Sequence, residues 1–329
     1  MASVRILHAS DLHIANQPNI TSPVDRFTPG TIKGAFTSGM LASSYDPSVL
    51  LSFAQFAYKQ DTRGLIDAVI LTGDISTTGS KEDLEKAFHF IYGLAAPGLG
   101  WKTTEAEARL GGLGVPIWLL PGNHDRYETT DYGYVPGGIL FDLAFQKDWQ
   151  GPVKLYKPIT KSGLTVTVLG VDFNLKQSRD CDRMFGWLAQ GNVYGKILDE
   201  LEAATKALPQ SSRQCVIWAM HFPPAYPRVS PYLKLLDSDL LILRANDCGI
   251  KAVLAGHTHD AVKYRRPNMK FDVFCAGTVS QDFAPEGNHF RVIEINSDDT
   301  GNITVGSDEY RFNKVTGGAI FNKSEFRKV

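Results

Sequence analysis

Five short apolar runs of this chain each end in a cluster of polar residues, and this pattern constrains the fold more than any other feature. The runs cover residues 4–9, 67–71, 115–120, 215–220 and 252–255. The clusters that follow them are Ser10-Asp11-Leu12-His13, Thr72-Gly73-Asp74, Pro121-Gly122-Asn123-His124-Asp125, His221-Phe222-Pro223-Pro224 and Gly256-His257-Thr258-His259. Runs of this length are typical of buried strands. Because α/β proteins bind ligands at the carboxyl edge of a sheet, the clusters are expected to meet in space.

The clusters offer eight candidate site residues suited to metal binding and proton transfer: Asp11, His13, Asp74, Asn123, His124, His221, His257 and His259. They include five of the eight histidines of the chain. A lone Asn-His-Asp also makes a good solvated turn, but five clusters at strand ends favour a site. The ligand set mixes nitrogen and oxygen without a thiolate, which suits manganese, iron or zinc better than magnesium or calcium.

The number of candidate ligands suffices for two metal ions. Two carboxylates, one amide oxygen and four histidines are available, with Asp74 as a natural bridge. Two ions about 3.5–4 Å apart produce a bound hydroxide near neutral pH and clamp a phosphate group. The sequence therefore predicts a dinuclear hydrolytic site that acts on a phosphate ester.

Length and composition predict one large α/β domain over residues 1–329, with a motif-bearing core at about 4–260 and C-terminal strands at about 271–329. Hydrophobic residues make up 43% of the 329 residues, and the net charge is −1. This balance does not support a nucleic-acid or anionic-membrane surface. The four cysteines are scattered without CxxC spacing, and no signal peptide or transmembrane run is found. We expect reduced thiols, a cytoplasmic protein and a small substrate; the oligomeric state stays open.

Hydrophobic periodicity places the remaining elements. Helices are expected at 47–59, 81–93, 139–149, 193–208 and 233–248, a further strand at 164–171, and antiparallel, half-exposed strands at 272–275, 289–295 and 303–305. Loops are expected at 15–46, 95–114 and 126–138; the first is either a wall of the site or a surface excursion. His8 is interpreted as a core residue, His89 as solvated and Asp172 as a turn residue.

The five clusters, in this order and with these residue types, resemble the motifs of the calcineurin-like metallophosphoesterases. The resemblance implies a four-layer α/β/β/α sandwich of two mixed sheets flanked by helices. It implies that the first metal is held by Asp11, His13, Asp74 and His259, and the second by Asp74, Asn123, His221 and His257. By the same resemblance, His124 contacts the phosphate and serves as the acid.

Within the family, residues 73–80 resemble the class III cyclic-nucleotide phosphodiesterase branch, as do 277–280 and 290–294. Thr77, Thr78 and Gly79 depart from the Ser/Thr protein phosphatases, in which an aspartate at this motif pairs with the acid histidine. The partner of His124 is therefore open, with Asp125 or a loop residue as alternatives. A phosphodiesterase of small diesters is expected; the alternatives are a nuclease, because residues 5–13 also resemble DNA-repair nucleases, a phosphomonoesterase, or a non-catalytic scaffold.

Overall fold

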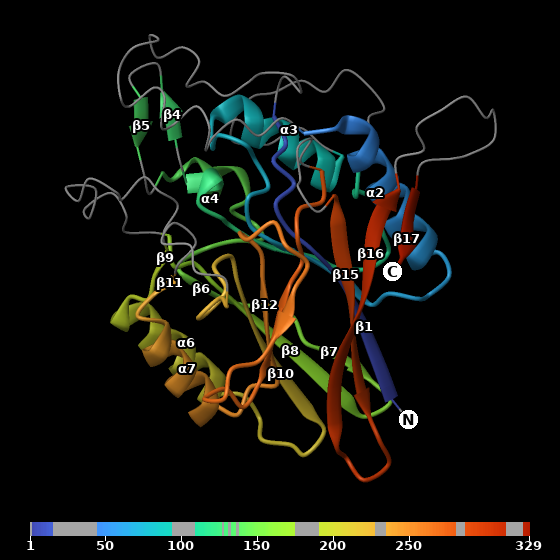
Figure 1. Cartoon of the computed structure of the whole chain (residues 1–329), viewed down its shortest axis with the longest axis vertical. Coiled ribbons are helices and arrows are strands. Elements are labelled where there is room, and N and C mark those ends of the chain that lie inside the picture. Colours follow the sequence, from blue (N-terminus) through green and yellow to red (C-terminus); the bar gives the residue numbers. More distant parts are fainter. Residues whose placement is uncertain are drawn as a thin grey trace.

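A computed structural model of the chain describes residues 2–15, 45–93, 109–126, 128–130, 133–135, 138–174, 191–227, 235–280, 287–313 and 325–329. These residues form two large mixed β-sheets with helices on their outer faces (Figure 1). No helix among them is both long and apolar enough to span a bilayer.

The first sheet contains six strands in the order β17-β16-β15-β1-β2-β3. Their bounds are β1 Ala2–Ala9, β2 Ala68–Thr72, β3 Ile117–Leu120, β15 His289–Ser297, β16 Ile303–Asn313 and β17 Glu325–Lys328. Strands β1, β2 and β3 are parallel, whereas β15, β16 and β17 continue the sheet by antiparallel pairing. The carboxyl ends of the three parallel strands therefore lie at one edge, and each is followed by one of the polar clusters.

The second sheet is built around four parallel strands, β8, β10, β12 and β14, with β6, β7 and β13 added antiparallel to them. The bounds are β6 Val153–Leu155, β7 Ile159–Lys161, β8 Leu164–Val171, β10 Gln214–Met220, β12 Ala252–Ala255, β13 Lys263–Tyr264 and β14 Asp272–Cys275. Two small pairs complete the strands: β4 Glu128–Thr130 with β5 Gly133–Val135, and β9 Gly191–Asn192 with β11 Leu235–Leu236.

The helices form the outer layers. They are α2 Pro47–Asp61, α3 Lys81–Tyr92, α4 Leu140–Ala144, α6 Gly195–Lys206 and α7 Ser238–Asp247, with a 3-10 turn η2 at His124–Arg126. Local capping explains where two of them begin. Asp46 accepts a hydrogen bond from the backbone of Ser48 at the start of α2, and Ser80 accepts one from Asp83 at the start of α3.

Strand β10 shows how the layers pack. Cys215, Ile217 and Ala219 contribute to the apolar cluster that lies between the sheets and extends under α2, α3 and α4. Trp218 and Met220 alternate with them and join a second cluster with α6 and α7. Successive side chains of a strand point to opposite faces, so the seven-stranded sheet is covered on both sides. The expected fold class, two mixed sheets flanked by helices, is confirmed.

Most expected elements are present near their expected bounds, including strand β8 at 164–171 and helix α3, in which Leu84, Ala87 and Ile91 form the buried stripe. His8 is fully buried, as expected of a core residue; burial, reinforced by the charge of Arg291, lowers its pKa to about 3. The 15–46 and 95–114 loops fall largely on residues 16–44 and 94–108, which lie outside the described part of the chain.

Several expectations were wrong. The 139–149 helix covers only Leu140–Ala144, and the 233–248 helix starts at Ser238 because Leu235–Leu236 pairs with β9. The 126–138 loop contains the β4–β5 hairpin, and β6 and β7 were missed. Strand β14 is parallel to β12 and mostly buried, because β13 pairs with its other edge and makes it an inner strand. Strand β15 is likewise mostly buried, because it lies between β1 and β16.

Two side-chain environments also differ from expectation. His89 is only 4% exposed, because both faces of α3 are covered along much of its length. Asp172 is the turn aspartate that was expected, since its Oδ1 accepts a hydrogen bond from the backbone N–H of Asn174 at 2.7 Å. It is also fully buried and forms an ion pair with Arg126, which was not expected. The burial of His89 and the ion pair of Asp172 escaped the sequence analysis for the same reason, since the pattern of one segment cannot show which other segment covers it.

Candidate metal centre

All eight candidate residues come together where the carboxyl ends of β1, β2 and β3 face those of β10 and β12. Seven of them are buried, and His259 is partly exposed. Groups of three acid or histidine side chains bring their ligand atoms within 4.8 Å of one another: Asp11, His13 and His259; His13, Asp74 and His124; and Asp74, His221 and His257. His13 and Asp74 each belong to two groups, so the groups form one continuous site.

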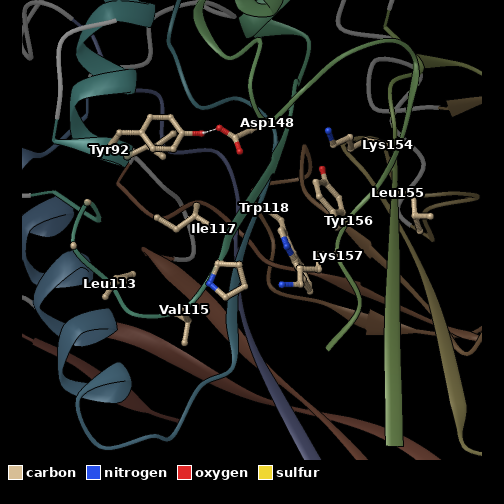
Figure 2. A pocket seen from close by; sticks show the side chains of 14 residues that line it. Tyr92, Leu113, Val115, Ile117, Trp118, Asp148, Lys154, Leu155, Tyr156 and Lys157 are labelled. Carbon is tan, nitrogen blue, oxygen red and sulfur yellow. Dashed lines mark hydrogen bonds between the residues drawn. The ribbon is translucent and has the colours of Figure 1, made fainter. Parts of the chain in front are cut away.

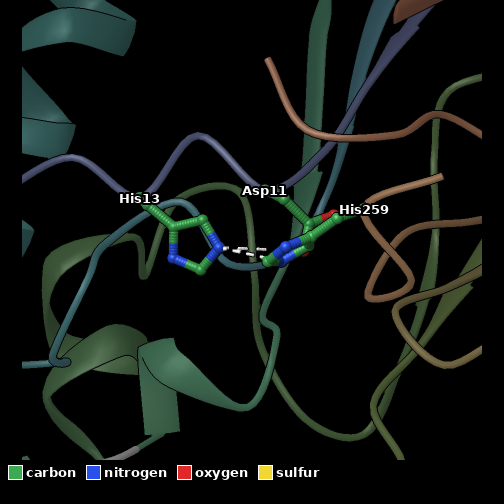
Figure 3. A group of neighbouring side chains, drawn as sticks. All are labelled: Asp11, His13 and His259. Atoms are coloured by element: carbon green, nitrogen blue, oxygen red, sulfur yellow. Dashed lines mark hydrogen bonds and ion pairs between the residues drawn. The ribbon is translucent and has the colours of Figure 1, made fainter. Parts of the chain in front are cut away.

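The first group joins the β1 cluster to the loop after β12. His259 Nε2 lies 3.2 Å from Asp11 Oδ1 and 3.3 Å from His13 Nε2. Figure 3 shows the two imidazole rings directed toward each other beside the carboxylate. Two ring nitrogens at this distance are compatible only if one carries a proton or both face a shared cation.

The second group is centred on His221. Its Nδ1 lies 2.8 Å from the carbonyl oxygen of Thr72, which can only accept, so Nδ1 carries the proton. When the ring is neutral, its Nε2 atom offers a lone pair. It lies 3.0 Å from Asn123 Oδ1 and 3.2 Å from Asp74 Oδ2, which are acceptors as well. Three acceptors converge at one point, an arrangement that a cation satisfies.

A buried ligand atom without a hydrogen-bond partner and the shifted pKa values of two histidines agree with a cation in this site. His257 Nε2 is buried and forms no hydrogen bond with any described residue. Burial alone would lower the pKa of His221, but the Asp74 carboxylate raises it to about 9. Burial and the neighbouring His221 lower the pKa of His257 to about 3. The region next to Asp74 therefore favours positive charge, and His257 stays a neutral imidazole. Metal ligation requires both.

The backbone of the site is strained. Of eight described non-glycine residues with positive φ, five are candidate ligands: Asp11 at 52°, His13 at 49°, Asp74 at 49°, His257 at 67° and His259 at 55°. The left-handed region costs on the order of 1–3 kcal/mol for such residues and persists where the surrounding structure imposes it. Each of these strands turns sharply as it ends, which directs the side chain into the site.

A family comparison agrees with this geometry. The sequence pattern of the calcineurin-like phosphoesterases matches residues 4–261. The chain belongs to this family. Its members are metal-dependent hydrolases of phosphate esters, and the candidate ligand groups described above fit that chemistry.

Solved structures share the fold of this phosphoesterase. A dimetal phosphatase from Danio rerio aligns with a TM-score of 0.54 at 12% identity, covering 88% of this chain and 95% of its own. GAP50, the anchor in the inner membrane complex of Plasmodium, aligns with a TM-score of 0.52 at 13% identity, covering 100% of this chain and 89% of its own. At such identities the likeness concerns the fold alone. No curated protein sequence matches the chain.

The open question of the partner of His124 has a structural answer. His124 Nδ1 lies 2.6 Å from the carbonyl oxygen of Thr77, so this ring nitrogen is the donor and Nε2 is left for the site. Asp125 has another role. Its carboxylate accepts hydrogen bonds from the backbone of Gly122, Ile75 and Ser76, at 2.9, 3.1 and 2.7 Å. Of the two alternatives, the loop residue is therefore correct, and Asp125 instead ties the β3 cluster to the β2 cluster.

Gly122 leaves no room for a side chain, which yields a prediction. A Cβ at this position would lie 2.2 Å from Asp74 Oδ1. We expect Gly122→Ala to displace Asp74 and to lower metal content and activity by about 10–100-fold, the cost of disturbing a residue that supports a ligand. Gly195→Ala is the control, because a Cβ there meets nothing within 4 Å. Wild-type metal content and activity in Gly122→Ala would contradict this account.

A cavity of about 510 Å³ lies elsewhere in this phosphoesterase. Its lining comes from the edge strands β3 and β6 and from neighbouring segments, and Tyr92 donates a hydrogen bond to Asp148 at its wall (Figure 2). None of the eight candidate site residues lines it. This cavity is therefore separate from the candidate metal centre.

Proposed function

We propose that this calcineurin-like phosphoesterase is a dinuclear metal-dependent phosphodiesterase of small diesters such as cyclic nucleotides. The observation that carries the proposal is the position of Asp74. It is shared by two groups of potential ligands, with His13 on one side and His221 and His257 on the other. A carboxylate in this position can bridge two ions, as dinuclear hydrolytic sites require.

The proposed ligand assignment follows the spatial groups. Asp11, His13, Asp74 and His259 hold one ion, and Asp74, Asn123, His221 and His257 hold the other. The nitrogen and oxygen donors favour manganese, iron or zinc. When bound, such a pair supplies an activated water and neutralises the charge of the phosphate.

His124 is proposed to be the catalytic acid. The Thr77 carbonyl fixes its Nδ1–H, so that Nε2 is the atom directed to the site, 3.9 Å from Asp74 Oδ2. In its protonated form the ring carries a second proton on Nε2, which can pass to the leaving oxygen as the phosphorus–oxygen bond breaks. The ring then remains neutral with the Nδ1–H···O=C hydrogen bond intact.

The diester preference is supported by sequence. Residues 73–80 resemble the class III branch, and a backbone carbonyl replaces the carboxylate that pairs with the acid histidine in the protein phosphatases. A cytoplasmic location is also proposed. It is supported by Cys215 and Cys275, which are free, buried thiols whose pKa values burial raises to about 12.

One activity panel tests the proposal. The purified enzyme, supplied in turn with manganese, iron and zinc, is expected to show a higher kcat/KM for bis-p-nitrophenyl phosphate and cyclic AMP than for p-nitrophenyl phosphate. Short DNA is included as the substrate that tests for nuclease activity. A clear preference for the monoester or for DNA contradicts the diester assignment, and inactivity with every metal contradicts phosphoester hydrolysis.

Chelation provides a readout independent of the substrate. Because the ions bind the native state, removing them is expected to lower its free energy of unfolding by about 4 kcal/mol when the metal had been present at about 1,000 times its Kd. The melting temperature should fall with the chelator and recover when metal is returned. An unchanged melting temperature together with a metal-free protein would contradict the metal site.

A further inference from the structure

Arg126, immediately after the Asn123-His124-Asp125 cluster, is one of the largest fully buried side chains among the described residues. All five of its side-chain N–H donors have acceptors. Nε and Nη2 donate to Asp172 Oδ2 at 3.0 and 2.6 Å, and Nη1 and Nη2 donate to the two oxygens of Asp142 at 2.9 and 3.0 Å. The remaining Nη1 donor binds the carbonyl oxygen of Gly138 at 3.0 Å.

These contacts connect three separate parts of the chain. Arg126 ends the 3-10 turn η2 that begins with His124, and its backbone N–H donates to the carbonyl oxygen of Asn123 at 3.1 Å. Asp172 follows the last residue of β8 in the second sheet, and Asp142 lies on α4. The turn that follows β3 in the first sheet is thereby fastened to the second sheet and to a helix.

Stability alone does not account for such a network. Burial disfavours the charge of Arg126, but Asp172 and Asp142 more than offset this and raise its pKa above the usual range. Replacing a buried ion pair by well-packed apolar side chains is often neutral or stabilising. Apolar side chains would not fix the orientation of the turn. A guanidinium group with five donors in fixed directions allows the turn few orientations.

We propose that Arg126, held by Asp172 and Asp142, is a positioning residue that directs the His124 side chain toward the substrate. This inference rests on the proposed role of His124 as the acid. Arg126 itself acts through the short turn: when the guanidinium shifts, the turn rotates and His124 Nε2 moves away from the leaving oxygen. Misplacement of a catalytic group by about 1 Å can cost about 100-fold in rate.

Arg126→Lys is the main test, because lysine keeps the charge and loses the fork of donors. We expect kcat to fall by about 10–100-fold for a diester with an alkyl leaving group, with metal content unchanged. The fall should be at least tenfold smaller for bis-p-nitrophenyl phosphate, whose leaving group needs little protonation. In a His124→Ala background, Arg126→Lys should cause no further loss, since coupled residues are not additive.

A second variant keeps the proposal testable if Arg126→Lys does not fold. Asp142→Asn leaves the Arg126–Asp172 pair in place and changes a carboxylate that is 34% exposed. It should show the same leaving-group pattern with a smaller loss. Arg244→Lys is the matched control, because Arg244 on α7 forms an ion pair with Glu202 at 2.7 Å and its side chain is 37% exposed. Its kcat should equal the wild-type value for both substrates.

The outcomes separate the two proposals. Equal losses for both leaving groups, or additive losses in the His124→Ala background, would overturn the positioning role while the enzyme remains a phosphodiesterase. If the wild type hydrolyses no phosphate ester, the proposed function is wrong. An NMR measurement then tests whether Arg126 positions His124. The Nδ1–H proton of His124, protected by its hydrogen bond to Thr77, should be visible in the wild type and lost in Arg126→Lys; an unchanged signal overturns the inference.

Discussion

Asp74→Ala is expected to remove more metal and more activity from this phosphoesterase than any other single ligand substitution. Asp74 is buried, belongs to two of the three ligand groups and accepts a hydrogen bond from the backbone of His124 at 2.8 Å. Changing a residue that only supports a ligand costs about 10–100-fold, so loss of a bridging ligand should exceed 100-fold in kcat/KM. The buried His221 would also lose the carboxylate that raises its pKa.

The comparison variant is His13→Ala. His13 also belongs to two groups, and its Nε2 faces His259 and Asp11, at 3.3 and 3.9 Å. We expect His13→Ala to lower the occupancy of one of the two ion sites and to retain more activity than Asp74→Ala. Metal analysis after gel filtration, with kcat/KM measured on the same samples, makes the comparison. Equal metal content in both variants and the wild type would show that Asp74 does not bridge.

His124→Ala is expected to lower kcat by about 10²–10⁴-fold, the usual contribution of general acid catalysis, while both ions stay bound. Asn123 is the proposed ligand, and neighbouring side chains point in different directions. The loss should be largest with an alkyl or ribose leaving group and smallest with p-nitrophenolate.

The same variant decides between two roles for His124. Its side chain lies close enough to His13 and Asp74 to complete a group of potential ligands. Metal analysis is therefore run beside the kinetics, with Asn123→Ala as the reference for loss of a ligand. If His124→Ala loses metal in proportion to its activity, His124 is a ligand and its role as the acid is wrong.

Much of the fold and the position of the candidate site could be predicted from local patterns. An apolar run that ends in glycine and polar residues identifies both a buried strand and the point where it turns. Five such runs predicted strands whose polar ends meet in space, and the structure brings all eight candidate residues together. Periodicity and caps likewise placed α2 and α3 within two residues of their observed ends.

Other features depended on contacts between distant segments. The burial of His89, the parallel pairing of β14 and the ion pair of Asp172 with Arg126 each involve a partner far along the chain. The hydrogen bond from His124 to Thr77 is the clearest case, since a carbonyl oxygen belongs to every residue and has no signature in sequence. Side-chain chemistry and local periodicity can be read along a chain, whereas the choice of a backbone partner is made only when sheets and turns pack against one another.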